Sequence, residues 1–120
     1  MIISVTLDEV ENIEDDDYLL LFASEECKAC HKMKGAFSIL YDAGQVPCNT
    51  YCIDLREGVE MGRAFTGFGL SNLPTLIHTR QDEERKRWGG FFGGDLRESA
   101  ERLRLVLDSA LQATRDPSGG

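Results

Sequence analysis

Short apolar runs separated by amphipathic stretches organise the first half of the chain. Residues 18–23 (YLLLFA) are apolar without interruption over the length of one strand, which predicts a strand covered on both faces. Residues 27–41 then place apolar side chains three to four positions apart, which predicts a helix, and Gly44 lies just past its end as a stop signal. Residues 49–55 (NTYCIDL) alternate loosely and predict a second buried strand.

The second half continues this alternation of helices and strands. Apolar residues recur at helical spacing over 59–65 and are followed by glycines, which predicts a second helix. Residues 73–79 (LPTLIHT) predict a third strand that begins at the proline, because proline has no N–H to give to a sheet. Residues 83–92 predict a turn and an edge strand, and residues 95–112 predict a strongly amphipathic helix with Asp95 as its N-cap.

This order of elements predicts a single α/β domain. Residues 1–7 are rich in β-branched side chains and predict a short first strand, and apolar residues at helical spacing over 7–13 predict a helix. A parallel strand–helix–strand unit followed by a hairpin and a closing helix predicts a central mixed sheet of four to five strands with helices on both faces. We expect the domain to span residues 1–112 and residues 113–120 to form a flexible tail.

Composition and charge exclude several classes of function. The net charge of −8 argues against nucleic-acid binding, which needs a positive surface. No apolar stretch is long enough to span a membrane, and residues 1–17 are acidic, unlike the basic start of a signal peptide. We therefore expect a cytoplasmic monomer that binds neither nucleic acid nor membrane. In a reducing compartment, its four cysteines are expected to serve catalysis or metal binding rather than structural disulfides.

The segment SEECKACHKMK (residues 24–34) contains the residues best suited to chemistry. Cys27 stands at the predicted start of a helix, where unpaired backbone N–H groups and the helix dipole stabilise a thiolate. Three lysines between residues 28 and 34 add positive charge. Cys30, one turn along, lies close enough to attack a mixed disulfide formed at Cys27. The spacing therefore favours a redox-active dithiol.

Two metal-binding interpretations use the same motif. Cys27, Cys30, Cys48 and Cys52 have the spacing C-x2-C-x17-C-x3-C, close to that of a four-thiolate zinc site. Cys52, however, lies inside an apolar strand pattern, where a small buried side chain is the ordinary interpretation. CKACH also matches the haem-attachment sequence, although that attachment takes place outside the cytoplasm. The pattern of residues alone leaves these two alternatives beside the redox one.

Three features together resemble the thioredoxin superfamily over roughly residues 3–111: the strand YLLLFA, the motif CKAC at the start of a helix, and LPT opening a later strand. The resemblance implies the thioredoxin fold and no metal or organic cofactor. It matches Cys27 to the attacking cysteine, Cys30 to the resolving cysteine, and Pro74 to a cis-proline beside the disulfide that positions the substrate. The substrate-binding residues expected around these positions are Glu26, Lys28, Ala29, Leu73 and Thr75.

Several positions depart from thioredoxins proper. Glu26 replaces a tryptophan before the first cysteine, and Lys28 and Ala29 replace glycine and proline between the cysteines. Leu21 stands where thioredoxins have a buried aspartate that assists the resolving thiol, and Gly35 stands where they have a helix-kinking proline; a glycine could also permit a bend. These departures fit a specialised or glutaredoxin-like reductase as well as a general one.

We therefore expect a thiol–disulfide oxidoreductase that reduces disulfides in protein substrates. Cys27 would form a mixed disulfide with the substrate and Cys30 would resolve it. A reductase or glutathione would recycle the oxidised pair. The alternative is a thioredoxin-fold binding or assembly module whose cysteines are non-catalytic or hold zinc.

Overall fold

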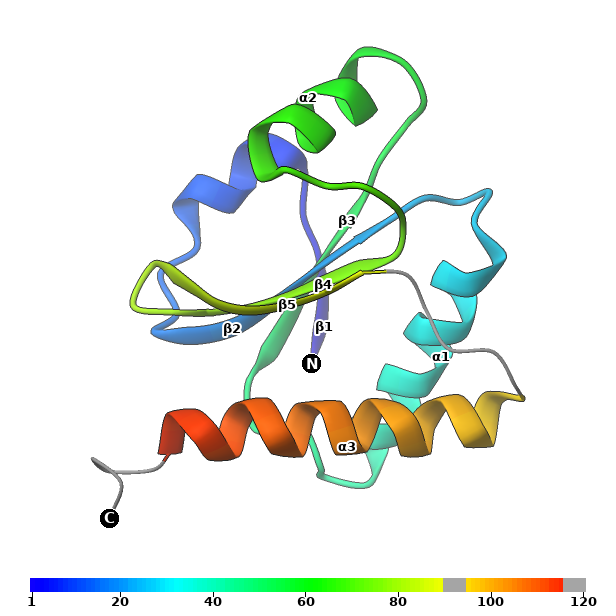
Figure 1. Ribbon diagram of the computed structural model, residues 1–120, viewed down its shortest axis with the longest axis vertical. Helices are drawn as coiled ribbons and strands as arrows, with labels where there is room; N and C mark the ends of the chain where they lie inside the picture. Colours follow the sequence, from blue (N-terminus) through cyan, green and yellow to red (C-terminus); the bar gives the residue numbers. More distant parts are fainter. Residues whose placement is uncertain (90–94, 116–120) are drawn as a thin grey trace.

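A computed structural model describes residues 1–89 and 95–115, with side chains described as far as residue 108 (Figure 1). The elements follow the order predicted from the sequence, and the additional first strand is present. Their bounds are β1 (Ile2–Ser4), the 3-10 helix η1 (Leu7–Asn12), β2 (Asp17–Ala23), α1 (Lys28–Asp42), β3 (Asn49–Asp54), α2 (Val59–Phe68), β4 (Thr75–Arg80), β5 (Glu83–Gly89) and α3 (Leu96–Arg115).

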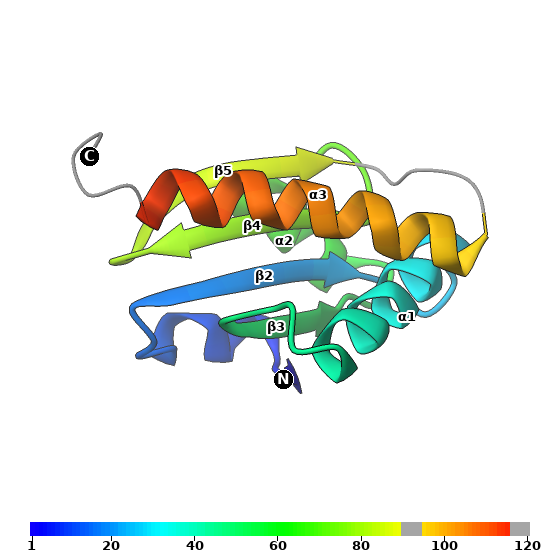
Figure 2. The ribbon, with the colours of Figure 1, turned by 90° about the horizontal axis from the view of Figure 1, so that it is seen from below.

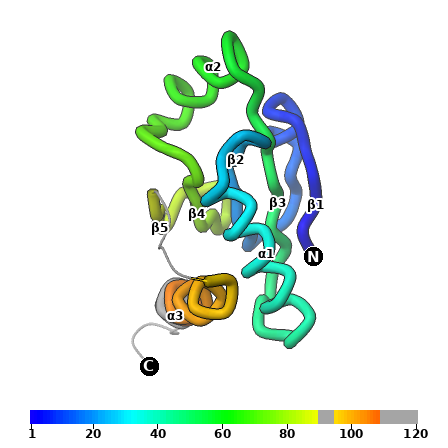
Figure 3. Tube along the Cα trace, turned by 90° about the vertical axis from the view of Figure 1, so that its right-hand side faces the viewer, coloured from blue at the N-terminus to red at the C-terminus, as the bar shows by residue number. Residues whose placement is uncertain are grey.

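The five strands form one mixed sheet in the order β1-β3-β2-β4-β5. β1, β3 and β2 run parallel, whereas β4 is antiparallel to β2 and β5 is antiparallel to β4. Helices α1 and α3 cover one face of the sheet and α2 covers the other, as Figures 2 and 3 show. η1 packs with α2. The predicted α/β sheet with helices on both faces is therefore confirmed.

The position of β2 in the middle of the sheet explains its uninterrupted apolar sequence. Its residues 19, 21 and 23 join the core under α1 and α3, and its residues 18, 20 and 22 join the core on the α2 side. Since successive side chains of a strand point to opposite faces, both sets must be apolar when both faces are covered. All six side chains are at most 5% exposed.

Two helix boundaries correct the sequence prediction. The helix predicted over residues 7–13 is the 3-10 helix η1, which suits apolar side chains that recur at every third position. The closing helix continues to Arg115, past the predicted domain end at residue 112, because the sequence contains no glycine or proline there before Pro117. Within residues 1–89 and 95–115, no helix is long and apolar enough to cross a membrane.

Two strand boundaries also differ. β4 begins at Thr75 rather than at the proline, directly after the cis Leu73–Pro74 peptide bond. The predicted edge strand 83–92 is observed as Glu83–Gly89, and residues 90–92 lie outside the described part of the chain.

Gly35 lies where α3 approaches α1. Helix α1 runs without interruption from Lys28 to Asp42, so the backbone stays helical on both sides of Gly35. A Cβ atom built on Gly35 would lie 2.9 Å from Cδ1 of Leu96, the first residue of α3. The missing side chain thus makes room for the start of α3 close to α1.

Candidate active site

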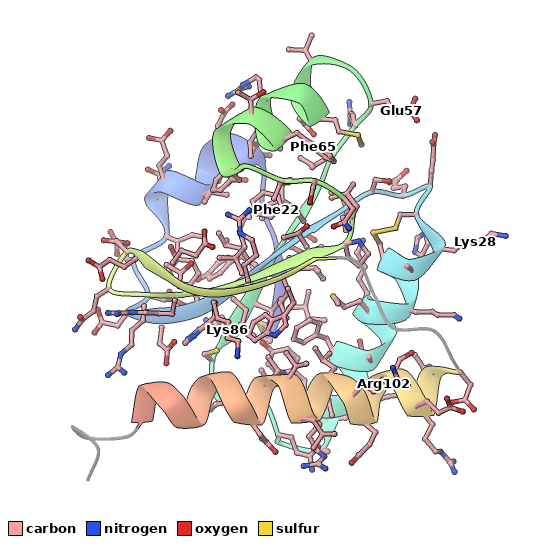
Figure 4. All side chains as sticks on the ribbon, viewed as in Figure 1. Phe22, Lys28, Glu57, Phe65, Lys86 and Arg102 are labelled. Carbon is pink, nitrogen blue, oxygen red and sulfur yellow. A yellow bond between two sulfur atoms is a disulfide. The ribbon has the colours of Figure 1, made fainter. Side chains whose placement is uncertain are left out.

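Cys27 lies at the N-terminus of α1, directly after the carboxyl end of β2. A turn in which the Cys27 N–H donates to the Ser24 carbonyl (3.2 Å) leads from the strand to the helix. Cys27 is the N-cap of α1, and its Sγ accepts a hydrogen bond from the Cys30 N–H at 3.1 Å. The first N–H groups of a helix have no partner within the helix, so they stabilise negative charge on a sulfur placed there. Figure 4 shows the two sulfur atoms at this end of α1.

Cys27 and Cys30 form a disulfide whose Cα atoms are 5.2 Å apart, an ordinary separation. The two sulfurs differ in access. The Cys30 side chain is 0% exposed and belongs to the core under α1, whereas Cys27 is partly exposed. A partner molecule can therefore reach Cys27 but not Cys30.

The loop before β4 faces Cys27 from a distant part of the chain. The Leu73–Pro74 bond is cis, as the resemblance implies, and the Leu73 carbonyl oxygen lies 3.9 Å from Cys27 Sγ. Pro74 is buried. The Thr75 hydroxyl donates to the Asn72 carbonyl at 2.7 Å, and the Thr75 side chain is only 2% exposed. This side chain holds the loop together and does not lie on the accessible surface.

The other residues expected to bind substrate surround Cys27. Glu26 and Lys28 are exposed, Ala29 and Leu73 are half-buried, and the Lys28 side chain extends away from α1 in Figure 4. Glu26, Lys28 and Ala29 thus flank Cys27 along the chain and the Leu73 carbonyl lies beside its sulfur, whereas Thr75 is buried.

A cavity of about 490 Å³ lies beside the turn that precedes Cys27. Its lining is mostly acidic and includes Glu57, which is labelled in Figure 4. A hydrogen bond between Glu26 and Glu57, together with the repulsion between their charges, raises the pKa of Glu26. The complete lining is Ser24, Glu25, Glu26, Asp54, Leu55, Arg56 and Glu57.

Asp54, which also lines this cavity, forms an ion pair that joins β3 to α1. Lys34 Nζ is 2.6 Å from Asp54 Oδ1, and the two side chains are 26% and 37% exposed. Burial disfavours the charge on Lys34, but the hydrogen bond to Asp54 and the attraction of Cys52, Asp54 and Glu25 together raise its pKa. The sequence predicts positive charge here but gives no sign that residue 54 is its partner, because the two residues are 20 positions apart.

The two remaining cysteines, Cys48 and Cys52, form no disulfide within the described part of the chain. Cys52 is buried in β3, where burial and the nearby Asp54 carboxylate raise its pKa to about 11. Cys48 precedes β3 and is half-buried. Among the residues that the structure describes, no three His, Cys, Asp or Glu side chains gather in a way that could hold a metal ion.

A buried histidine that the sequence pattern did not single out lies at the far end of β2 from the disulfide. His78 is 0% exposed, and its Nε2 lies 2.5 Å from Asp17 Oδ1. Its Nδ1 has no hydrogen-bond partner among the side chains and backbone groups that the structure describes. The only signal in the sequence was a histidine inside an apolar strand pattern, and its distance along the sheet places it outside the candidate site.

Comparison with known proteins gives structural matches only. No protein-family model matches the chain, and no curated protein sequence matches it. A mutant thioredoxin from Halobacterium salinarum is 19% identical and superimposes with a TM-score of 0.69, covering 91% of this chain and 89% of its own. Thioredoxin O2 from Arabidopsis thaliana in its oxidised state is 16% identical with a TM-score of 0.66, covering 90% and 92%.

A third structure, the thioredoxin Mala s 13 from Malassezia sympodialis, is 13% identical with a TM-score of 0.68, covering 92% of this chain and 90% of its own. The matches span nearly the whole of both chains in each case. The chain therefore has the thioredoxin fold, which confirms the fold that the motifs CKAC and LPT imply.

Proposed function

We propose that this chain is a thiol–disulfide oxidoreductase that reduces disulfides in proteins. The observation that carries the proposal is the unequal pair of sulfurs: Cys27 is accessible and receives an N–H hydrogen bond at a helix start, and Cys30 is completely buried behind it. An accessible sulfur whose thiolate is stabilised suits attack on a partner. A buried sulfur one helical turn away suits the later, internal attack.

The reaction proceeds in two exchanges. In the reduced chain, the Cys27 thiolate attacks one sulfur of a substrate disulfide, a Cys27–substrate disulfide forms, and the other substrate sulfur leaves as a thiolate that takes up a proton. Cys30 then loses its proton and attacks the Cys27 sulfur. The Cys27–Cys30 disulfide forms and the second substrate sulfur leaves as a thiolate. Two electrons pass from the dithiol to the substrate.

The surface around Cys27 supports binding of an extended substrate segment. The Leu73 carbonyl lies beside the sulfur, where main-chain groups of a substrate could add to the loop as a strand adds to a sheet edge. In this proposal Glu26, Lys28 and Ala29 contact residues flanking the substrate disulfide, and Pro74 and Thr75 fix the loop that presents Leu73.

Regeneration requires a second thiol donor. A reductase or glutathione would attack the exposed Cys27 sulfur of the oxidised pair and restore both thiols. The thiols Cys48 and Cys52 are unbridged, which suits work in a reducing compartment such as the cytoplasm.

Reduction of insulin by dithiothreitol tests the proposal, because separation of the insulin chains produces turbidity. The unaltered chain should accelerate precipitation, and Cys27→Ser should abolish the acceleration. Cys48→Ser is the matched control and should retain it, since this half-buried thiol lies outside the pair. A chain that does not accelerate precipitation would instead be a binding or assembly module, and a Cys27→Ser variant with full turnover would refute the assignment of Cys27.

A further inference from the structure

The ion pair between Lys34 and Asp54 lies close to the buried sulfur of the pair. Lys34 follows Cys30 by four residues in α1, so both side chains project from the same face of the helix, one turn apart. The Lys34 ammonium reaches across to β3 and meets Asp54 at 2.6 Å. Both charged groups are more than half buried, so water screens them incompletely.

The sheet registers place the partner of Lys34 at the same end of the domain as the disulfide. Asp54 is paired with Ala23, the last residue of β2 before the turn to Cys27, and Cys52 is paired with Leu21. Leu21, Ala23, Cys30 and Cys52 belong to one buried cluster. The partly exposed pair of Lys34 and Asp54 therefore lies at the edge of this cluster, at the carboxyl ends of β2 and β3.

The buried side chains packed around Cys30 are apolar, and the charged groups lie at the edge of their cluster. β2 contributes Leu21 and Ala23, and the described α3 side chains in the cluster are Ala100, Leu103 and Leu107, all uncharged. Charged or titratable groups come from α1 (Lys34), from β3 (Cys52 and Asp54) and from the preceding turn (Glu25), as their mutual electrostatic interactions show. His31, the next residue along α1, is exposed, and its Nε2 lies 2.6 Å from the Glu25 carbonyl.

A buried thiol must ionise before it can resolve a mixed disulfide. Burial opposes ionisation because the thiolate loses its hydration, so a neighbouring cation is the feature that can offset this cost. Lys34 is the cation of the interacting group that also contains Cys52, Asp54 and Glu25, and it projects from the same helix face as Cys30.

We propose that Lys34 is a positioning residue for the second exchange: its ammonium, held by Asp54, favours the thiolate of Cys30. This inference rests on the proposed function and names what controls its resolving step. The thiolate then attacks the Cys27 sulfur, the bond from Cys27 to the substrate sulfur breaks, and the substrate leaves with the electron pair of that bond.

The two partners of the ion pair have opposite effects on Cys30, and this makes the inference testable. Removing Lys34 takes away a cation and leaves Asp54 unpaired, and both changes disfavour the Cys30 thiolate. Removing the charge of Asp54 leaves Lys34 unpaired, which favours the thiolate. A purely structural ion pair predicts the same effect from both changes, because each breaks the same contact.

The test is residue-specific NMR titration of carbon-13-labelled cysteine in a Cys27→Ser background, where Cys30 titrates without a coupled partner. Lys34→Met should raise the Cys30 titration midpoint by about one pH unit, the shift ordinary for a charge near a buried group. Asp54→Asn should lower it, and Lys34→Arg should leave it near its original value. Lys32→Met, an exposed lysine on the same helix, is the matched control and should change it little.

Single-turnover kinetics in the chain with both cysteines give the second measurement. A midpoint raised by one unit leaves about tenfold less thiolate at neutral pH, offset roughly threefold by the greater nucleophilicity of the more basic sulfur. Resolution in Lys34→Met should therefore be about threefold slower at pH 7 and recover at alkaline pH, whereas attack by Cys27 should keep its rate.

Equal shifts in Lys34→Met and Asp54→Asn, or no shift in either, would overturn the inference. The NMR titration needs no enzymatic turnover, so its result stands whether or not insulin reduction succeeds. A chain without reductase activity would refute the proposed function, and an active chain without opposed titration shifts would refute only the role of Lys34.

Discussion

Asp17 and His78 form a polar pair whose two members should differ in their importance for stability. His78 is 0% exposed, and Asp17 supplies its only hydrogen bond in the described structure, while the Asp17 side chain is 38% exposed. Asp17→Ala leaves both ring nitrogens of the buried His78 without a hydrogen-bond partner among the described residues. A buried polar group that loses its partner costs about 1–3 kcal/mol. For a domain of this length, about 2 kcal/mol lowers the unfolding temperature by roughly 8 °C.

The reverse deletion should cost little. His78→Leu replaces a buried polar ring by an apolar side chain, and the Asp17 carboxylate that it leaves behind can be hydrated because it is partly exposed. We therefore expect a change in the free energy of unfolding of less than about 1 kcal/mol, of either sign. In the His78→Leu background, Asp17→Ala should then have almost no effect, since the group that needed the carboxylate is gone.

Urea unfolding at pH 7, followed by the fluorescence of Trp88, measures all four chains of this cycle. Equal decreases in the free energy of unfolding from Asp17→Ala and His78→Leu would refute the reasoning. They would mean that the loss comes from breaking the hydrogen bond itself and not from burying a ring without a partner. A loss from Asp17→Ala that persists in the His78→Leu background would refute it as well.

Two further predictions concern the surroundings of the disulfide. In a Leu96→Ala background, Gly35→Ala should raise the free energy of unfolding by about 1 kcal/mol through helix propensity. In the unaltered chain the gain should be clearly smaller, because the new Cβ would contact Leu96 and force its side chain to move. Urea unfolding measures both gains, and identical gains in the two backgrounds would contradict the prediction. Glu57→Gln should lower the pKa of Glu26 toward its ordinary value, because it removes the carboxyl group that hydrogen-bonds to Glu26 and repels its charge. The raised pKa of Glu26 in the folded chain stabilises the fold at acid pH and loses this effect as the pH rises through it. NMR titration of the side-chain carboxyl of Glu26 checks the direction, and an unchanged midpoint would contradict it.

Features encoded by neighbouring residues were predictable from the sequence. The continuous apolar run of β2, the helical spacing of α1 and its stop near Gly44 each depend on a few consecutive positions, and each element appears where the pattern predicts it. The N-terminal position of Cys27 on α1 followed from the same patterns, since a motif between a strand and a helix must lie at the junction.

Features that depend on how distant segments pack were not predictable. Lys34 and Asp54 each look like an ordinary surface charge until α1 is laid against β3. Thr75 was expected on the substrate surface because it follows the proline, but the loop turns its hydroxyl inward to Asn72. The pairing of His78 with Asp17 likewise requires β4 to lie antiparallel beside β2.

Trapping of the covalent intermediate tests the central claim most directly. A Cys30→Ser chain is incubated with a disulfide-containing protein, and the products are mapped by mass spectrometry without reduction. We predict one substrate attached to each chain through Cys27, stable because no resolving sulfur remains. The absence of such a product, or its attachment at Cys48 or Cys52, would contradict the account.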